Sequence, residues 1–208
     1  AVQARELTQL QTILQNQIER FGEHMFKDGS MVIPGEIALN TKYEYVKLAS
    51  HSTATVSNLQ DLTITGSTSG ITATVINTTE TTSTAAATVY VLYTASGTDN
   101  ATKRFTEGET LTFTYNSTSS TAVVGTSGTS LPTDSNAIGF ASSVNVQAGV
   151  YFINGFFVKN TEQTLILDPY SNTPTYRVGF NVTESFVTPS DDSSLNDNAA
   201  GSSNVNAP

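Results

Sequence analysis

Histidine and cysteine, two residue types that often carry out catalysis, are scarce and absent, respectively, in this chain. The sequence holds two histidines, His24 and His51, and it has no cysteine and no tryptophan. A nucleophile that is activated by a histidine also needs an acid that orients the imidazole, and neither histidine has such neighbours in the sequence. No phosphate-binding, zinc-protease or nucleophile-elbow motif occurs. We therefore expect both histidines to lie exposed or at an edge of the fold, and we expect no enzymatic activity.

The carboxylates are grouped in ways that do not favour a reaction or a metal. Glu107 and Glu109 flank a glycine in a predicted hairpin turn, whereas glycoside cleavage requires two carboxylates that face each other across a cleft. Asp191 and Asp192 lie near Asp197, but their spacing does not match a calcium-binding loop. The sequence predicts no cofactor and no metal site.

Composition limits the partners of the chain. Its 208 residues suffice for one ordinary domain or two small ones. Hydrophobic residues make up 38% and charged residues only 13%, so serine, threonine and asparagine supply most of the polar surface. The net charge of −9 gives no general attraction to a phosphate backbone. No apolar run approaches the ~20 residues that span a membrane. We expect no nucleic-acid partner and no membrane insertion.

One strong helical signal stands at the start of the chain, over roughly residues 4–27. Apolar side chains recur every three or four residues and form one stripe. The stripe consists of Leu7, Leu10, Leu14, Ile18, Phe21 and Met25. Either the helix packs on its own domain, or it bundles with copies of itself. A heptad repeat would place Gln17 and His24 in the seam, so a long left-handed coiled coil is not favoured.

The rest of the chain favours β-structure. Short alternating runs between about residues 53 and 128 are separated by glycines, which is typical of a small sandwich or barrel. Asn154-Gly155 between two apolar runs predicts a hairpin with a type I′ turn. Tyr176, Val178, Phe180 and Val182 alternate and predict a further strand.

We therefore expect a mainly β fold, in which an N-terminal helix precedes one or two small antiparallel sandwich or barrel units. The expected segments are an assembly helix (1–30), a Ser/Thr-rich β unit (31–135), an aromatic hairpin unit (136–187) and an extended arm or linker (188–208). The last segment is poor in apolar residues, which is typical of a linker.

Three stretches together resemble virion structural proteins of tailed phages, in tail fibres and baseplates. ARELTQLQTILQNQIERFGEHMFKDGSMVIPG, residues 4–35, resembles the opening helix, turn and short apolar strand of that family. GVYFINGFFVKNTEQTLILDPY, residues 149–170, resembles its aromatic hairpin. The closing stretch from residue 175, TYRVGFNVTESFVTPSDDSSLNDNAAGSSNVNAP, resembles its final segment. The three stretches make up about half of the chain, and the middle is generic.

The resemblance implies a structural role in the virion, within a larger parent protein, and a closing segment that is ordered against its neighbours. We expect an attachment and assembly module that forms a homotrimer and contacts other tail or baseplate proteins. The resemblance implies that three chains associate, and the stripe from Leu7 to Met25 is the expected interface between them. The alternative is a receptor-binding or adhesin β module that contacts host surface glycan through tyrosines. A polysaccharide hydrolase is disfavoured because histidine is scarce and cysteine and tryptophan are absent.

Overall fold

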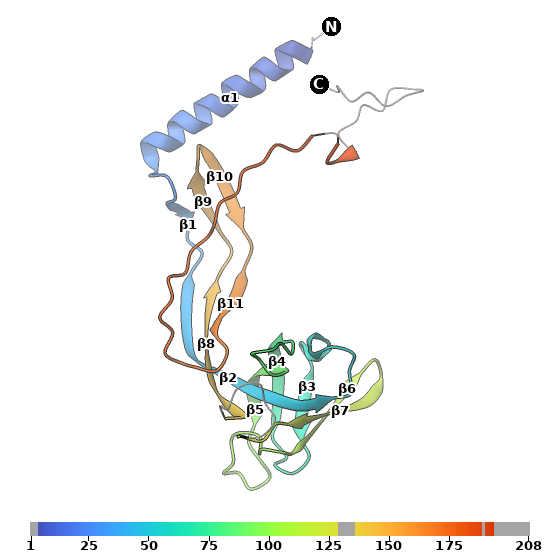
Figure 1. Cartoon of the computed structure of the whole chain (residues 1–208). Helices are drawn as coiled ribbons and strands as arrows, with labels where there is room; N and C mark the ends of the chain where they lie inside the picture. The colour runs from blue at the N-terminus through green and yellow to red at the C-terminus, as the bar shows by residue number, and fades with distance from the viewer. Residues whose placement is uncertain (1–3, 129–135, 189, 194–208) are drawn as a thin grey trace, which may run out of the picture. The chain divides into compact units, whose positions relative to one another are not determined.

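The computed structural model describes residues 4–128, 136–188 and 190–193. The described part is mainly β, with one long α-helix at its start, which confirms the expected fold class (Figure 1). The helices are α1 (Ala4–Met25) and the short 3₁₀ helix η1 (Val56–Leu59). The strands are β1 (Met31–Ile33), β2 (Ile37–His51), β3 (Thr63–Gly66), β4 (Thr72–Thr79), β5 (Thr88–Ala95), β6 (Thr110–Tyr115), β7 (Thr118–Val124), β8 (Ile138–Val146), β9 (Gly149–Ile153), β10 (Phe156–Asn160) and β11 (Gln163–Asp168).

The chain forms two compact units, and their composition differs from the expected segments. The helix–hairpin unit comprises residues 1–35, 148–161 and 176–208, and the barrel unit comprises residues 36–147 and 162–175. The two units divide the chain differently from the expected boundary near residue 135, because β8 pairs with β2 and β11 pairs with β8. The β2–β8 pairing joins residues that are about 100 positions apart, and local sequence patterns carry no signal for such distant pairing.

The barrel unit is built on a ring of antiparallel strands. The order β2-β5-β4-β3-β6-β7 closes because β2 also pairs with β7, and this closure protects both edges of the ring. The two sides of β2 serve different clusters, since successive side chains of a strand point to opposite faces. Val46 and Leu48 enter the main core, whereas Tyr43 and Tyr45 belong to a second, aromatic cluster. Lys47 lies on this second face, fully buried, with its Nζ 4.0 Å from the ring centroid of Tyr170.

A buried carboxylate holds two loops of the barrel unit together. Glu109 is only 5% exposed and immediately precedes β6. Its Oε1 accepts hydrogen bonds from the Thr106 backbone N–H at 2.5 Å and from the Ser69 hydroxyl at 3.1 Å. Its Oε2 accepts from the backbone N–H groups of Thr68 at 3.2 Å and Ser69 at 3.0 Å. One side chain thereby satisfies three backbone donors in the loops that precede β4 and β6.

The helix–hairpin unit contains the sheet β1-β9-β10. The predicted Asn-Gly turn joins β9 to β10, with φ of 48° at Asn154 and 84° at Gly155, so this prediction is confirmed. The turn is tied to the chain after α1, because the Asn154 N–H donates to Asp28 Oδ1 at 2.8 Å. The Gly29 N–H likewise donates to the Phe152 carbonyl at 2.8 Å.

The predicted strand at residues 176–182 is not a strand. The segment runs without regular secondary structure, and its alternating apolar side chains are exposed. Only Phe180 among them makes an aromatic contact, with its ring centroid 5.4 Å from that of Tyr151. A period of two describes an extended backbone, but a strand also needs a hydrogen-bonded neighbour. Most of the predicted arm, 188–208, lies outside the described residues.

Candidate functional site

The apolar stripe of α1 is the most conspicuous surface of the helix–hairpin unit. Leu7 and Leu10 are each 54% exposed, and Phe21 and Met25 are each 63% exposed. On a helix the residues three and four positions away cover part of every side chain. The observed exposure is therefore close to that of a helix with nothing packed on this face. The structure places all six predicted interface residues together on one face, and the described residues do not cover that face.

The stripe is narrow. At about 100° of rotation per residue, its six side chains fall within an arc of about 80°. A helix that packs on a sheet or a globular core usually presents an apolar face wider than ~100°, whereas a helix-bundle seam is narrower. Ile13 lies outside the arc, about 60° beyond its edge, and is also exposed, at 48%.

The helix contacts its own sheet through a different face, close to its C-terminal end. Gly22 is buried, and a Cβ at this position would collide with the ring of Phe152. Just beyond α1, the Phe26 ring centroid lies 6.0 Å from that of Phe152 and 5.8 Å from that of Phe157. Gly22 and Phe26 stand about 40–80° beyond the edge of the stripe. The helix thus contacts its own hairpin through one face, while no described residue packs over the face that carries the stripe.

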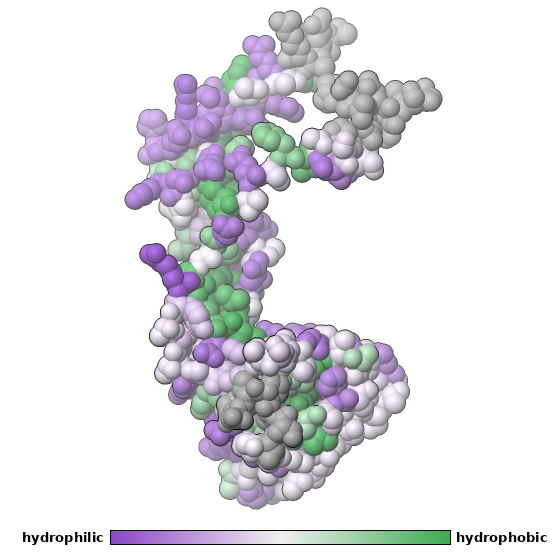
Figure 2. All heavy atoms as spheres, viewed as in Figure 1, coloured by the Kyte–Doolittle hydropathy of each residue, from purple (hydrophilic) through white to green (hydrophobic). Residues whose placement is uncertain are grey.

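The pictures agree with this division. Figure 1 shows that only the C-terminal end of α1 reaches the β9–β10 hairpin. Figure 2 shows mainly hydrophilic side chains on the visible face of α1, and hydrophobic side chains gathered over the hairpin. Phe156 and Val158 of β10 are 54% and 43% exposed. Exposed apolar side chains therefore occur on both the helix and the sheet of this unit.

Sequence reasoning identified the stripe but missed the contact that anchors the helix. From the sequence, a glycine inside a predicted helix indicates only a low helix propensity, which costs about 1 kcal/mol relative to alanine. In the structure Gly22 allows the Phe152 ring to approach the helix backbone. The aromatic residues of the hairpin could have revealed this contact, because their rings pack closely on a flat surface such as a helix face at a glycine.

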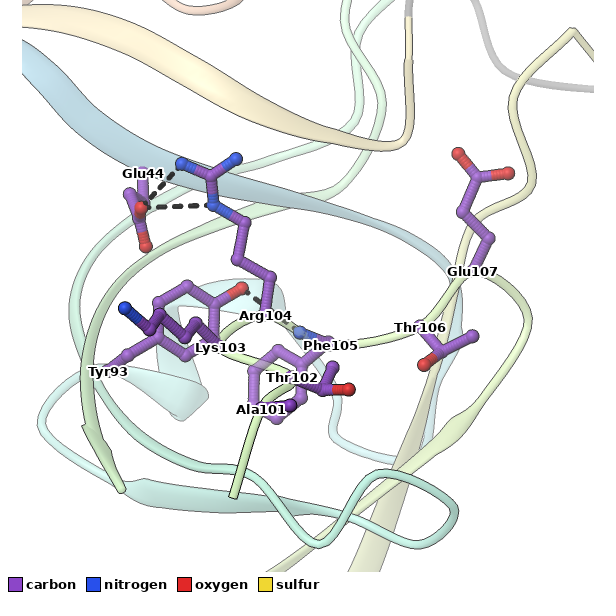
Figure 3. Close-up of a pocket in the computed structure, with 9 residues that line it drawn as sticks. All are labelled: Glu44, Tyr93, Ala101, Thr102, Lys103, Arg104, Phe105, Thr106 and Glu107. Carbon is purple, nitrogen blue, oxygen red and sulfur yellow. Dashed lines mark hydrogen bonds and ion pairs between the residues drawn. The ribbon is translucent and has the colours of Figure 1, made fainter. Parts of the chain in front are cut away.

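A shallow hollow of about 820 Å³ opens on the barrel unit and is the other candidate site (Figure 3). Its polar side is the pair Arg104–Glu44, in which Arg104 Nε and Nη2 both donate to Glu44 Oε1, at 3.1 and 2.9 Å. The Arg104 guanidinium also lies 4.3 Å from the ring centroid of Phe140. These contacts fix the arginine as part of the wall.

The hollow does not present the features of a sugar site or of a hydrolase. Its aromatic residues, Tyr93 and Phe105, pack on each other with centroids 5.2 Å apart, and Phe105 is only 4% exposed. Burial raises the pKa of Tyr93 well above its usual range, which is typical of a phenol inside a wall. Glu44 is bound to arginine, and Glu107 accepts hydrogen bonds from the Ser127 hydroxyl and N–H. Both carboxylates of the hollow therefore have structural partners.

The remaining residues with chemical potential also make local contacts. His24 Nδ1 lies 2.7 Å from the Arg20 carbonyl, one helical turn away. His51 Nδ1 lies 2.9 Å from the Thr53 carbonyl. Asp191 accepts hydrogen bonds from the Thr188 N–H at 2.9 Å and hydroxyl at 2.7 Å, and these bonds lower the pKa of its carboxyl. His51 also interacts electrostatically with the Glu80 carboxylate, which accepts hydrogen bonds from the Val56 and Ser57 N–H groups.

Within the described residues, no cluster of three or more histidines, aspartates or glutamates could hold a metal ion. In the same part of the chain, no helix combines the length and the hydrophobicity needed to cross a lipid bilayer.

Comparison with known proteins does not identify a function, which is therefore inferred from the residues of the chain. No family model, no curated protein and no solved structure matches the chain.

Proposed function

We propose that this chain is a structural component of a phage tail, in a tail fibre or baseplate, and that it acts as an attachment and assembly module without catalytic activity. Its partners are two further copies of itself, in a homotrimer, and neighbouring tail or baseplate proteins. The single observation that carries the proposal is the uncovered stripe on α1, from Leu7 to Met25.

Energetics support an assembly role for the stripe. Complete burial of a leucine, isoleucine or phenylalanine side chain is worth roughly 1.5–3 kcal/mol. The six stripe residues are about half exposed, so each stands to gain about 1 kcal/mol when copies associate. In a trimer this gain applies to all three helices. A surface of this kind on a chain with few charges is typical of a protein interaction site.

The resemblance of residues 4–35, 149–170 and 175–208 to tailed-phage virion proteins supplies the biological setting. All three stretches fall largely in the helix–hairpin unit. The generic middle of the sequence forms most of the barrel unit, whose Arg104–Glu44 hollow offers no open aromatic platform for a glycan. The described residues thus favour assembly over the adhesin alternative.

Charge substitutions in the stripe test the assembly role. Leu10→Asp and Leu14→Asp place a carboxylate in the proposed contact, where an unpaired buried charge is strongly unfavourable. Asn16→Asp is the matched control, because it adds the same charge on the opposite face of α1. We expect the leucine variants to be monomers with the helix and barrel intact, and the control to remain assembled, as measured by light scattering and circular dichroism.

Two outcomes would count against the proposal. Assembly that survives both leucine substitutions would move the contact away from α1. Particle images provide the second check: antibodies against this chain should label the tail in electron micrographs of the virion, and labelling confined to the capsid would contradict the tail assignment.

A further inference from the structure

The apolar positions of α1 repeat after eleven residues. Three pairs of stripe residues are related in this way: Leu7 and Ile18, Leu10 and Phe21, and Leu14 and Met25. Eleven residues correspond to three helical turns of about 3.67 residues each, which is slightly more than the 3.6 of a straight helix. Helices that keep such a repeat in their seam wind around each other with a shallow right-handed twist.

A seven-residue repeat would use different residues. Leu7, Leu10, Leu14 and Phe21 fit both patterns, but a heptad would continue through Gln17 and His24. These two side chains are polar and lie on one margin of the stripe, whereas Ile18 and Met25 lie within it. The two geometries therefore differ in whether positions 17 and 24 or positions 18 and 25 approach the axis.

Charge along the helix fits a contact between identical chains. In a bundle with one threefold axis the helices run parallel, so each residue meets its own copies at the same height. Like charges beside such a seam repel, and the chain as a whole carries a net charge of −9. Residues 7–18 contain no charged side chain. Beyond them, Glu23 stands almost opposite the stripe on the helical wheel.

The anchored end of the helix is compatible with such a bundle. Gly22 and Phe26 pack against the rings of the hairpin on a face next to the stripe, and they leave Phe21 and Met25 free, both 63% exposed. Each copy thus keeps its contact with its own sheet while its stripe turns to the axis.

From these observations we infer that α1 packs against the α1 helices of two further copies in a parallel bundle with an eleven-residue repeat, and that Leu7, Leu10, Leu14, Ile18, Phe21 and Met25 form its six core layers. The inference rests on the proposed homotrimer and adds the register, the direction and the twist of the contact. It predicts that Ile18 and Met25 of one copy lie beside Ile18 and Met25 of the next.

Disulfide cross-linking of the full chain tests this geometry cleanly, because the sequence contains no cysteine. Four single variants are compared: Ile18→Cys, Met25→Cys, Gln17→Cys and His24→Cys. After mild oxidation, Ile18→Cys and Met25→Cys should give a species of twice the chain mass on denaturing gels. Gln17→Cys and His24→Cys serve as matched controls one residue away and should stay mainly at the mass of one chain. Circular dichroism of each variant verifies that α1 is intact.

The outcomes separate this inference from the proposed function. Linkage at positions 17 and 24 that equals or exceeds linkage at 18 and 25 would replace the eleven-residue repeat by a heptad and leave the trimer standing. An assembled wild type in which none of the four positions links would remove α1 from the interface and overturn the inference. A wild type that is monomeric by light scattering would overturn both.

Discussion

Replacement of Glu109 by glutamine should destabilise the barrel unit although it changes the shape of the side chain very little. The carboxylate accepts four hydrogen bonds, three of them from backbone N–H groups of Thr68, Ser69 and Thr106. Glutamine keeps one acceptor oxygen and replaces the other by an NH₂ group. Whichever way the amide is turned, at least one backbone N–H then faces another donor, and the remaining bonds lose their charge.

A hydrogen bond to a charged group contributes about 1.5–3 kcal/mol. With one such bond lost and others weakened, the free energy of unfolding should fall by about 2–3 kcal/mol. For a chain of this length, 1 kcal/mol corresponds to roughly 2–4 °C, so the midpoint of thermal unfolding should fall by about 5–10 °C. Glu109→Ala removes all four bonds and should cost more than the glutamine variant.

Chemical and thermal denaturation followed by circular dichroism measures this change, at one protein concentration, since assembly makes the midpoint depend on concentration. Glu36→Gln is the control: Glu36 is exposed in the same unit, and its variant should unfold within about 0.5 kcal/mol of the wild type. If Glu109→Gln unfolds as late as the control, the role of Glu109 in holding the two loops is refuted.

Three further predictions concern other parts of the molecule. Burial raises the pKa of Tyr90 to about 12, so the unfolded chain loses this proton first, near pH 10. The free energy of unfolding should therefore fall as the pH rises from about 10 to about 12. In urea melts at alkaline pH, Tyr90→Phe should remove about 2–3 kcal/mol of that loss. An alkaline loss that is unchanged in this variant would contradict the burial of the phenol. Glu44→Gln breaks the partly exposed pair with Arg104 and should lower the free energy of unfolding by less than about 1 kcal/mol in urea melts, whereas a larger cost would mean that the pair is more desolvated than its exposure indicates. Deletion of residues 1–30 should leave the β circular dichroism signal intact and reduce the light-scattering mass to that of one chain; a variant that stays assembled would place the contact in the β units.

Local signals in the sequence were sufficient for the elements that depend on local physics. The period of the stripe predicted the helix over roughly 4–27, and α1 spans Ala4–Met25. Asn154-Gly155 predicted the β9–β10 hairpin because few residues other than asparagine and glycine accept a positive φ at both central positions of the turn.

Distant pairing and partners were not accessible in the same way. The alternation from Tyr176 to Val182 predicted a strand, but no described residue supplies the hydrogen-bonded neighbour that a strand requires. The assignment of β8 to the barrel unit follows from its pairing with β2, which has no local signature, and β11 joins the unit through its pairing with β8. Glu109 was considered only as a turn residue, because two of its three backbone donors, Thr68 and Ser69, come from about 40 positions away.

The mass of the wild-type chain in solution tests the central claim most directly. Multi-angle light scattering across a wide range of concentrations should give three times the 22.0 kDa of one chain, and dilution should shift the species toward the single chain as the six-layer contact dissociates. A constant mass of 22.0 kDa at the highest concentration would contradict assembly through the Leu7–Met25 stripe.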